Sequence, residues 1–102
     1  MKNEFHVLIH RNDENVHFKL TGDFDEKAAS EFMNALDLYA WNASRVFVHT
    51  DALNAINDFD EQRFKSRLYN NPKCHAVKIL PTGRFSRIFI PPEHTLEYTL
   101  TV

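Results

Sequence analysis

The segment 16–41 constrains the fold of this chain most, because two different hydrophobic periods follow each other within it. Apolar and polar residues alternate from Val16 to Thr21, which is the period of a strand with one buried face. From Ala29 to Ala40, apolar residues recur instead at the spacing of a helix with one buried face. The segment therefore predicts a half-buried strand followed by an amphipathic helix, which ends at Trp41-Asn42.

Four residues, Gly22-Asp23-Phe24-Asp25, join this predicted strand to the predicted helix. Gly22 permits a sharp reversal of the chain, and the carboxylate of Asp23 or Asp25 can accept hydrogen bonds from the first N–H groups of a helix. Asp23 and Glu26 also have the spacing of a capping box. We therefore expect the helix to begin at this turn, with either aspartate as its cap.

The N-terminal segment Phe5–His10 predicts a first strand that pairs with Val16–Thr21 in a hairpin. A turn centred on Asp13-Glu14 places Ile9 opposite Phe18 and gathers the bulky apolar side chains on one face. The same register places His10 directly opposite His17.

The middle of the chain predicts three further elements. Arg45–Thr50 is a β-branched run typical of a central strand, and a connection follows over residues 51–58. A second helix is expected from Asp60 to Tyr69, with Phe64 and Leu68 turned inward. Ala76–Leu80 is the next predicted strand, and residues 81–83 the turn after it.

The last twenty residues leave two alternatives open. Thr95–Val102 alternates as a terminal strand does. Residues 84–90 fit either a strand paired with it or a short helix, and we favour the strand. The predicted order is ββαβαβ with a β-rich C-terminal tail. This indicates an α/β fold with a mixed sheet of four to six strands and helices packed on one face, because right-handed crossovers place both helices on the same side.

Length and composition restrict the class of protein. The 102 residues are expected to form one domain spanning 1–102, with no membrane-spanning run. Residues 1–4 lack the apolar run of a secretory signal, and the single cysteine, Cys74, fits a reducing compartment. A cytoplasmic location is therefore expected. Residues 1–62 carry five Lys/Arg against twelve Asp/Glu, and residues 63–102 carry seven against two, so the two halves differ in charge unless they interleave in space.

The order of elements, together with particular residues, resembles the STAS family, the fold of bacterial anti-sigma-factor antagonists. The matching features are the strand and turn over residues 18–25, the helix 28–38, the strand 46–50 and the loop 53–60 before the second helix. The family's first turn reads apolar-Gly-Glu/Asp-apolar-Asp, and this chain keeps that spacing. The resemblance covers roughly residues 5 to 80 and implies a non-catalytic, regulatory protein-binding domain.

The chain departs from this family in the loop before the second helix. Members regulated by kinases carry an Asp-Ser-Ser-Gly-like motif there, and one serine accepts the phosphate. Here the corresponding residues are Asn57, Asp58, Phe59 and Asp60, and none has a hydroxyl group. The resemblance therefore implies a domain that is not switched by serine phosphorylation at this loop, or one that Asp58 and Asp60 hold in a single charge state. An aspartate also carries less negative charge than a phosphoserine, so it replaces one incompletely.

Several groups of residues have the composition of a functional site, and each has a simpler interpretation. His10 and His17, with His6 on the same face, suggest a metal site, but histidines also occupy solvated sheet faces. Cys74 and His75 are adjacent on an extended segment, so their side chains point apart and form no nucleophile–base pair. We therefore expect no metal or other cofactor.

Two charged groups also have structural interpretations. A basic stretch interleaved with aromatic residues resembles a nucleic-acid surface, although its helical part has the pattern of a solvated helix face, so nucleic acid is not the expected partner. This stretch comprises Arg63, Lys65, Arg67, Lys73, Lys78, Arg84 and Arg87. The carboxylates of Asp23 and Asp25, and of Asp58 and Asp60-Glu61, are explained by helix capping. No catalytic constellation is present, so we do not expect an enzyme.

The leading interpretation is a domain that binds another protein, either a kinase-like regulator or a larger complex. The predicted surface is the loop before the second helix together with the exposed side of that helix, with Phe59 as an anchor. It comprises Asn57, Asp58, Phe59, Asp60, Glu61, Gln62, Arg63 and Lys65. A small-ligand or lipid-binding module with an apolar groove between sheet and helices is the alternative, suggested by nine Phe, three Tyr and one Trp. A homodimer through Thr95–Val102 is also left open.

Overall fold

The computed structural model describes residues 3–40, 42–71 and 77–90. Five strands are described: β1 (His6–Asn12), β2 (Asn15–Phe24), β3 (Arg45–His49), β4 (Leu53–Ile56) and β5 (Lys78–Thr82). Two α-helices, α1 (Glu26–Tyr39) and α2 (Glu61–Tyr69), and a 3₁₀ helix, η2 (Ser86–Phe89), complete the described elements. Neither α1 nor α2 is long and apolar enough to cross a bilayer.

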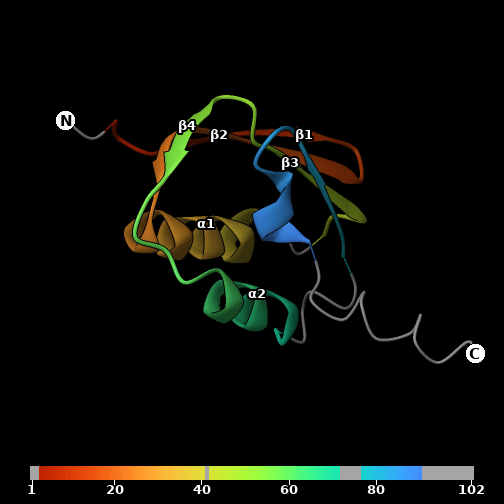
Figure 1. Ribbon diagram of the computed structural model, residues 1–102. Coiled ribbons are helices and arrows are strands. Elements are labelled where there is room, and N and C mark those ends of the chain that lie inside the picture. Colours follow the sequence, from red (N-terminus) through yellow and green to blue (C-terminus); the bar gives the residue numbers. More distant parts are fainter. Residues whose placement is uncertain (1–2, 41, 72–76, 91–102) are drawn as a thin grey trace, which may run out of the picture.

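The strands form one mixed sheet, with the helices on one side of it (Figure 1). The order across the sheet is β1-β2-β3-β5, and β4 pairs with the far end of β2. The β1–β2 pair is antiparallel and the others are parallel. The predicted α/β class, with a mixed sheet and helices on one face, is confirmed.

The N-terminal hairpin has the predicted register. Ile9 lies opposite Phe18 and His10 lies opposite His17. Asp13, in the turn, adopts a φ of 55°, a left-handed conformation that Asp tolerates better than most residues. The alternation in β2 therefore places its apolar side chains under α1 and its polar side chains on the opposite, open face of the sheet.

Phenylalanine rings fill the layer between sheet and helices. Phe24 of β2, Phe32 of α1, Phe64 of α2 and Phe89 of η2 are all buried, and their ring centroids lie 5.1 to 6.0 Å apart. Most of these pairs are edge-to-face, an arrangement that suits the ring quadrupoles. The cluster joins segments from both halves of the chain.

The predicted reversal at Gly22 is wrong, because β2 continues through Gly22 to Phe24. Gly22 has a φ of +89° and lies at a register shift between β2 and β4, so it permits a bulge rather than a turn. The helix consequently begins after Asp25, which caps it. The predicted Asp23–Glu26 capping box is therefore also wrong.

Three other predictions change in the second half. Part of the predicted connection 51–58 forms β4, which pairs with the extended end of β2. The predicted turn at residues 81–83 begins too early, because Pro81 and Thr82 belong to β5, an outer strand that tolerates proline. Residues 86–89 form η2, not a strand, and bury Ile88 and Phe89. The predicted strand 95–102 and residues 74–76 lie outside the described parts.

Candidate functional site

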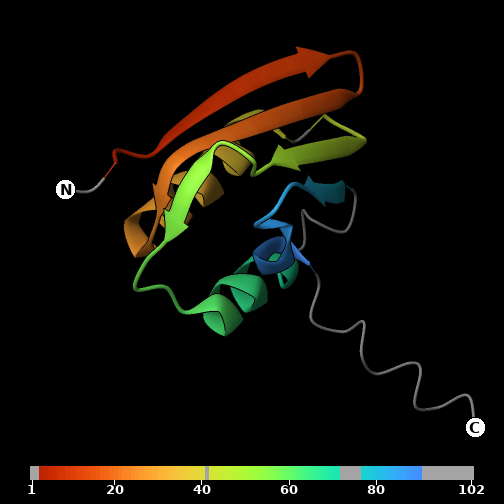
Figure 2. The same cartoon turned by 45° about the horizontal axis from the view of Figure 1, so that its top comes forward.

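The predicted binding surface lies at one corner of the molecule, where the loop 57–60 passes from β4 to α2 beside the start of α1 (Figures 1 and 2). The backbone N–H of Asn57 donates to the carbonyl oxygen of Phe24 at 2.8 Å. Its side-chain amide donates to Oδ2 of Asp23 at 3.3 Å. The first residue of the loop is thus fixed to the end of β2.

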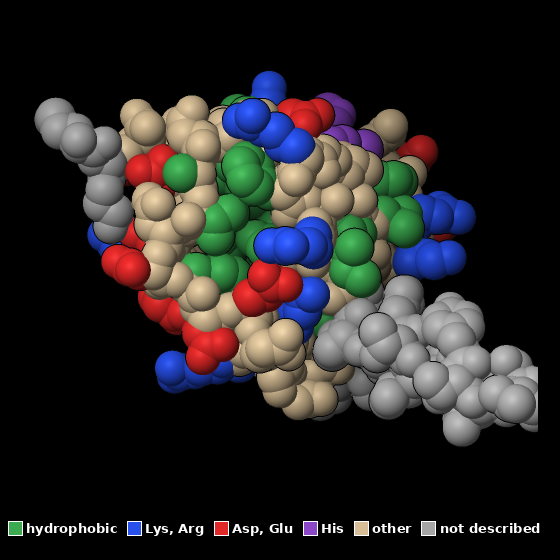
Figure 3. All heavy atoms as spheres, viewed as in Figure 1, with side chains coloured by type: hydrophobic (Ala, Val, Ile, Leu, Met, Phe, Trp, Pro, Cys, Tyr) green, Lys and Arg blue, Asp and Glu red, His purple; other side chains and the backbone are tan. Residues whose placement is uncertain are grey.

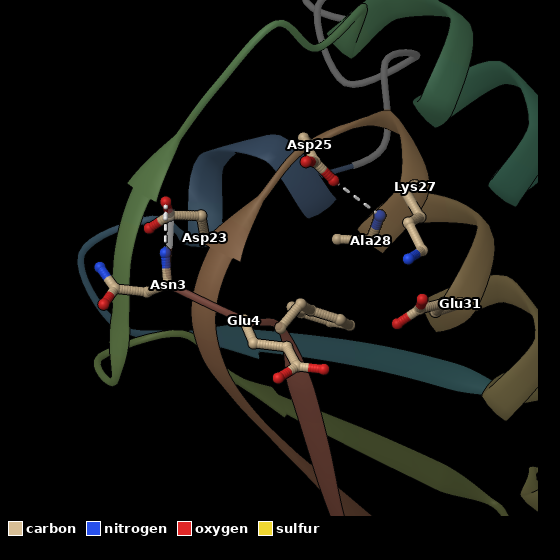
Figure 4. A pocket seen from close by; sticks show the side chains of 8 residues that line it. Asn3, Glu4, Asp23, Asp25, Lys27, Ala28 and Glu31 are labelled. Atoms are coloured by element: carbon tan, nitrogen blue, oxygen red, sulfur yellow. Dashed lines mark hydrogen bonds between the residues drawn. The ribbon is translucent and has the colours of Figure 1, made fainter. Parts of the chain in front are cut away.

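Asp23 is a buried carboxylate that joins three segments at this corner. Its Oδ2 also accepts the backbone N–H of Asn3 at 3.1 Å (Figure 4). Its Oδ1 is buried and has no hydrogen-bond partner among the described residues. Asp23 therefore holds the N-terminal segment against the loop, a structural role that its proximity to Asp25 in the sequence does not reveal.

The two helices begin side by side and are linked by a carboxylate. Asp25 Oδ1 accepts the N–H of Ala28 at 2.9 Å and so caps α1 (Figure 4). Asp60 Oδ1 accepts the N–H of Arg63 at 3.1 Å and caps α2. Glu26, in the first turn of α1, accepts the backbone N–H of Asp60 at 2.8 Å. Sequence reasoning missed Glu26 as part of this corner, because the contact spans 34 residues of chain.

The middle of the loop has one residue turned outward and one turned inward. Asp58 is exposed and has a φ of +35°, at the edge of the left-handed region. The half-buried ring of Phe59 lies 5.1 Å from that of Phe24 and 5.3 Å from that of Phe64. Phe59 therefore helps fix the loop to the core, and Asp58 is presented at its tip.

On the exposed side of α2, some side chains form ion pairs and others extend into solvent. Glu61 lies 3.1 Å from the ammonium of Lys65 and 3.9 Å from the guanidinium of Arg87. Gln62 and Arg63 are exposed. The structure thus brings all eight predicted residues into one region but engages Glu61 and Lys65 with each other.

Two shallow pockets lie beside this corner. One, of about 290 Å³, is bounded by the N-terminal segment, the end of β2 and the start of α1 (Figure 4). The other, of about 430 Å³, is lined by Asp25, Glu26, Lys27, Asn57 and Asp58. Acidic side chains gather on this side of the molecule (Figure 3). A complementary surface would therefore be basic.

The open face of the sheet carries His10, His17 and His49. Nδ1 of His17 and Nε2 of His49 are 2.9 Å apart, and the ring of Phe47 stacks on His17 at 4.7 Å. Burial, and then the neighbouring His17 and Lys19, lower the pKa of His49, while Asp51 opposes this. No group of three or more metal-ligating side chains is found within residues 3–40, 42–71 and 77–90.

The basic stretch and the pair Cys74–His75 are two other groups that the sequence singles out. The described basic residues lie on several elements: three on α2, Lys78 on β5, and Arg84 before η2, where it donates to the carbonyl oxygen of Leu53 and lies over the ring of Phe85. Lys73, Cys74 and His75 lie outside the described residues. The layer between sheet and helices, where the alternative ligand groove was expected, is occupied by the phenylalanine cluster. Native mass spectrometry of freshly purified protein would test that alternative.

Comparisons with known proteins bear on the fold alone. No family model matches this sequence, and no curated protein matches it. A solved structure described as "Crystal Structure Analysis of Mglu" is similar, with a TM-score of 0.63 and 15% identity over 76% of this chain. The match covers 19% of that chain, so this domain corresponds to about a fifth of the larger protein. Fold and site together define a small α/β domain with a mixed sheet, two helices on one face and an acidic corner.

Proposed function

We propose that this chain is a divergent STAS-like domain that binds another protein through the loop 57–60 and the exposed side of α2. The observation that carries the proposal is the loop itself. It is fixed at Asn57, Phe59 and Asp60, yet it presents Asp58 to solvent between two helix N-termini. A rigid loop loses little conformational entropy when it binds, which favours its use in recognition.

The charge of the corner indicates the kind of partner. The loop and the starts of the two helices carry two cations, Lys27 and Arg63, against five carboxylates, and a basic partner surface would complement this excess of acidic residues. These residues are Asp25, Glu26, Asp58, Asp60 and Glu61. The partner is a regulatory protein or a larger complex in the cytoplasm, and its binding does not depend on serine phosphorylation of this loop.

Site-specific crosslinking tests the surface directly. A photoreactive phenylalanine analogue replaces Gln62 on α2 or, as the control, Asn34, an equally polar exposed residue of α1. After irradiation in cells of the source organism, we expect a defined adduct from position 62 and none from position 34. Equal labelling at both positions, or no adduct at 62, would contradict the proposed surface.

A charge reversal tests the role of the loop tip. Asp58→Lys should weaken capture of the crosslinked partner at least about tenfold, since it places a cation where a basic surface would dock. Asp37→Lys, a reversal at an exposed position near the C-terminal end of α1, is the control and should leave capture unchanged. Circular dichroism should show both variants folded. If both reduce capture equally, general electrostatics and not this loop would account for the binding.

A further inference from the structure

We propose that two copies of this chain associate through β1, which pairs antiparallel with the β1 of the second copy. Within the described residues β1 pairs only with β2, so its outer side is a free edge. Figure 2 shows β1 along the outer margin of the sheet. The backbone N–H and C=O groups along such an edge are a template for another strand.

The edges of this sheet differ in how they are protected. β4 has only four residues, and short edge strands offer little to pair with. β5 carries Lys78 and Pro81, a charge and a residue without a backbone N–H. β1 has seven residues in regular register with β2 and contains neither Lys nor Pro. It is therefore the unprotected edge.

Exposed hydrophobic side chains collect along the same edge. Leu8, 57% exposed, and Ile9, 36% exposed, are neighbours on β1 and point to opposite faces of the sheet. Leu38 and Tyr39, at the end of α1, are 71% and 50% exposed, and with Ile9 they line a pocket of about 200 Å³. Clustered exposed apolar residues of this kind mark an interaction surface.

Charge favours a second copy over an acidic partner. Arg11 is the arginine of β1, and its guanidinium donates to the carbonyl oxygens of Tyr39 at 3.5 Å and Asn42 at 3.1 Å. Its charge is thus engaged with the C-terminal end of α1, where a cation is favourable. The strand contains no carboxylate. It therefore presents a largely neutral, apolar edge, which fits an equally neutral strand.

The strand is compatible with itself in an antiparallel register centred on Ile9. This register places Ile9 against its own copy, Arg11 opposite Val7 and His10 opposite Leu8, so no two like charges lie directly opposite. Because Leu38 and Tyr39 lie beside Ile9, a two-fold axis there brings the hydrophobic side chains of both copies together. The contact is isologous and closes at two copies.

Sedimentation equilibrium over a wide concentration range tests the association. We expect a reversible dimer for the wild-type chain. Ile9→Lys should raise its dissociation constant at least about tenfold, because it places two cations at the two-fold axis. Ile90→Lys is the matched control, since Ile90 is 38% exposed and lies away from β1, and it should leave the constant unchanged.

A crosslink tests the register. In a Cys74→Ser background, Ile9→Cys should form a disulfide-linked dimer on mild oxidation, and Ile90→Cys should not. A wild-type chain that stays monomeric at all concentrations, or a dimer that Ile9→Lys leaves intact, would overturn the proposal. The substitutions at Ile9 leave the loop 57–60 unchanged. Capture of the regulatory partner by these variants therefore tests the proposed function separately from dimer formation.

Discussion

Gly22 is needed at its position because the backbone of a distant segment, at Glu4, packs directly against it. A Cβ atom at this position would lie 2.1 Å from the carbonyl oxygen of Glu4, and the φ of +89° disfavours any side chain. We expect Gly22→Ala to lower the free energy of unfolding by at least about 2 kcal/mol, measured by urea denaturation. Thr21→Ala, at the adjacent half-buried position, is the control. A loss no larger than that of the control would show that the N-terminal segment can move away.

His49 should make stability depend on pH. Its pKa is lowered from the ordinary value of 6.5 by burial and by His17 and Lys19, with Asp51 acting in the opposite sense. The unfolded chain therefore binds more protons than the fold near that pH, so stability contributed by neutral His49 is present above pH 6.5 and is lost as the pH falls through the lowered pKa. Urea denaturation at successive pH values should show this decline in the wild type and a smaller one in His49→Gln. If His49→Gln had the same pH dependence of stability as the wild type, the decline could not be assigned to His49.

The start of α1 is the clearest test at the scale of a single element. Of the two candidate caps, Asp23 and Asp25, it is Asp25 that accepts a backbone N–H of the helix, that of Ala28. Asp25→Ala should therefore destabilise the fold by about 1 kcal/mol, whereas Asp25→Ser should retain most of the stability because serine also caps helices. Thermal or urea denaturation measures both. Equal losses in the two variants would mean that capping is not the relevant contact.

The elements also differ in how far sequence could predict them. β2, α1 and α2 carry strong local periodicity and capping residues, and each was predicted within a few residues. β4 has four residues, too few for a period to be recognised, and exists because β2 extends past Gly22 to pair with it. The favoured strand over residues 84–90 is wrong because the apolar residues of η2, Ile88 and Phe89, are buried by packing against the core and not by local alternation.

For the whole molecule, Phe89 connects the end of the described chain to the core. Its buried ring contacts those of Phe24, Phe32 and Phe64. Phe89→Ala should lower the free energy of unfolding by about 3–5 kcal/mol, a large part of the stability of a small domain. Phe47→Ala, on the open face of the sheet, should cost clearly less. Chemical denaturation compares the two, and equal losses would show that the cluster does not dominate the core.

The candidate site was only partly visible in the sequence. Its eight residues were found because they are consecutive or nearly so, and the structure places them in one region. Glu26 and Asp23 complete the corner through contacts with residues 34 positions away, and no local pattern encodes such contacts. The phenylalanine cluster likewise joins residues from four elements.

Local patterns in the sequence are enough to predict β2, α1 and α2 within a few residues, the register of the hairpin, and the side of the sheet that is buried. These follow from periods of two and 3.6 residues and from capping side chains, which act over a few residues. Three features arise instead from packing between distant segments: β2 runs on past Gly22, Asp23 joins three segments, and β1 is left as an unprotected edge. Each of these depends on which distant backbone lies within hydrogen-bonding or van der Waals distance, and that is fixed only when the whole core packs.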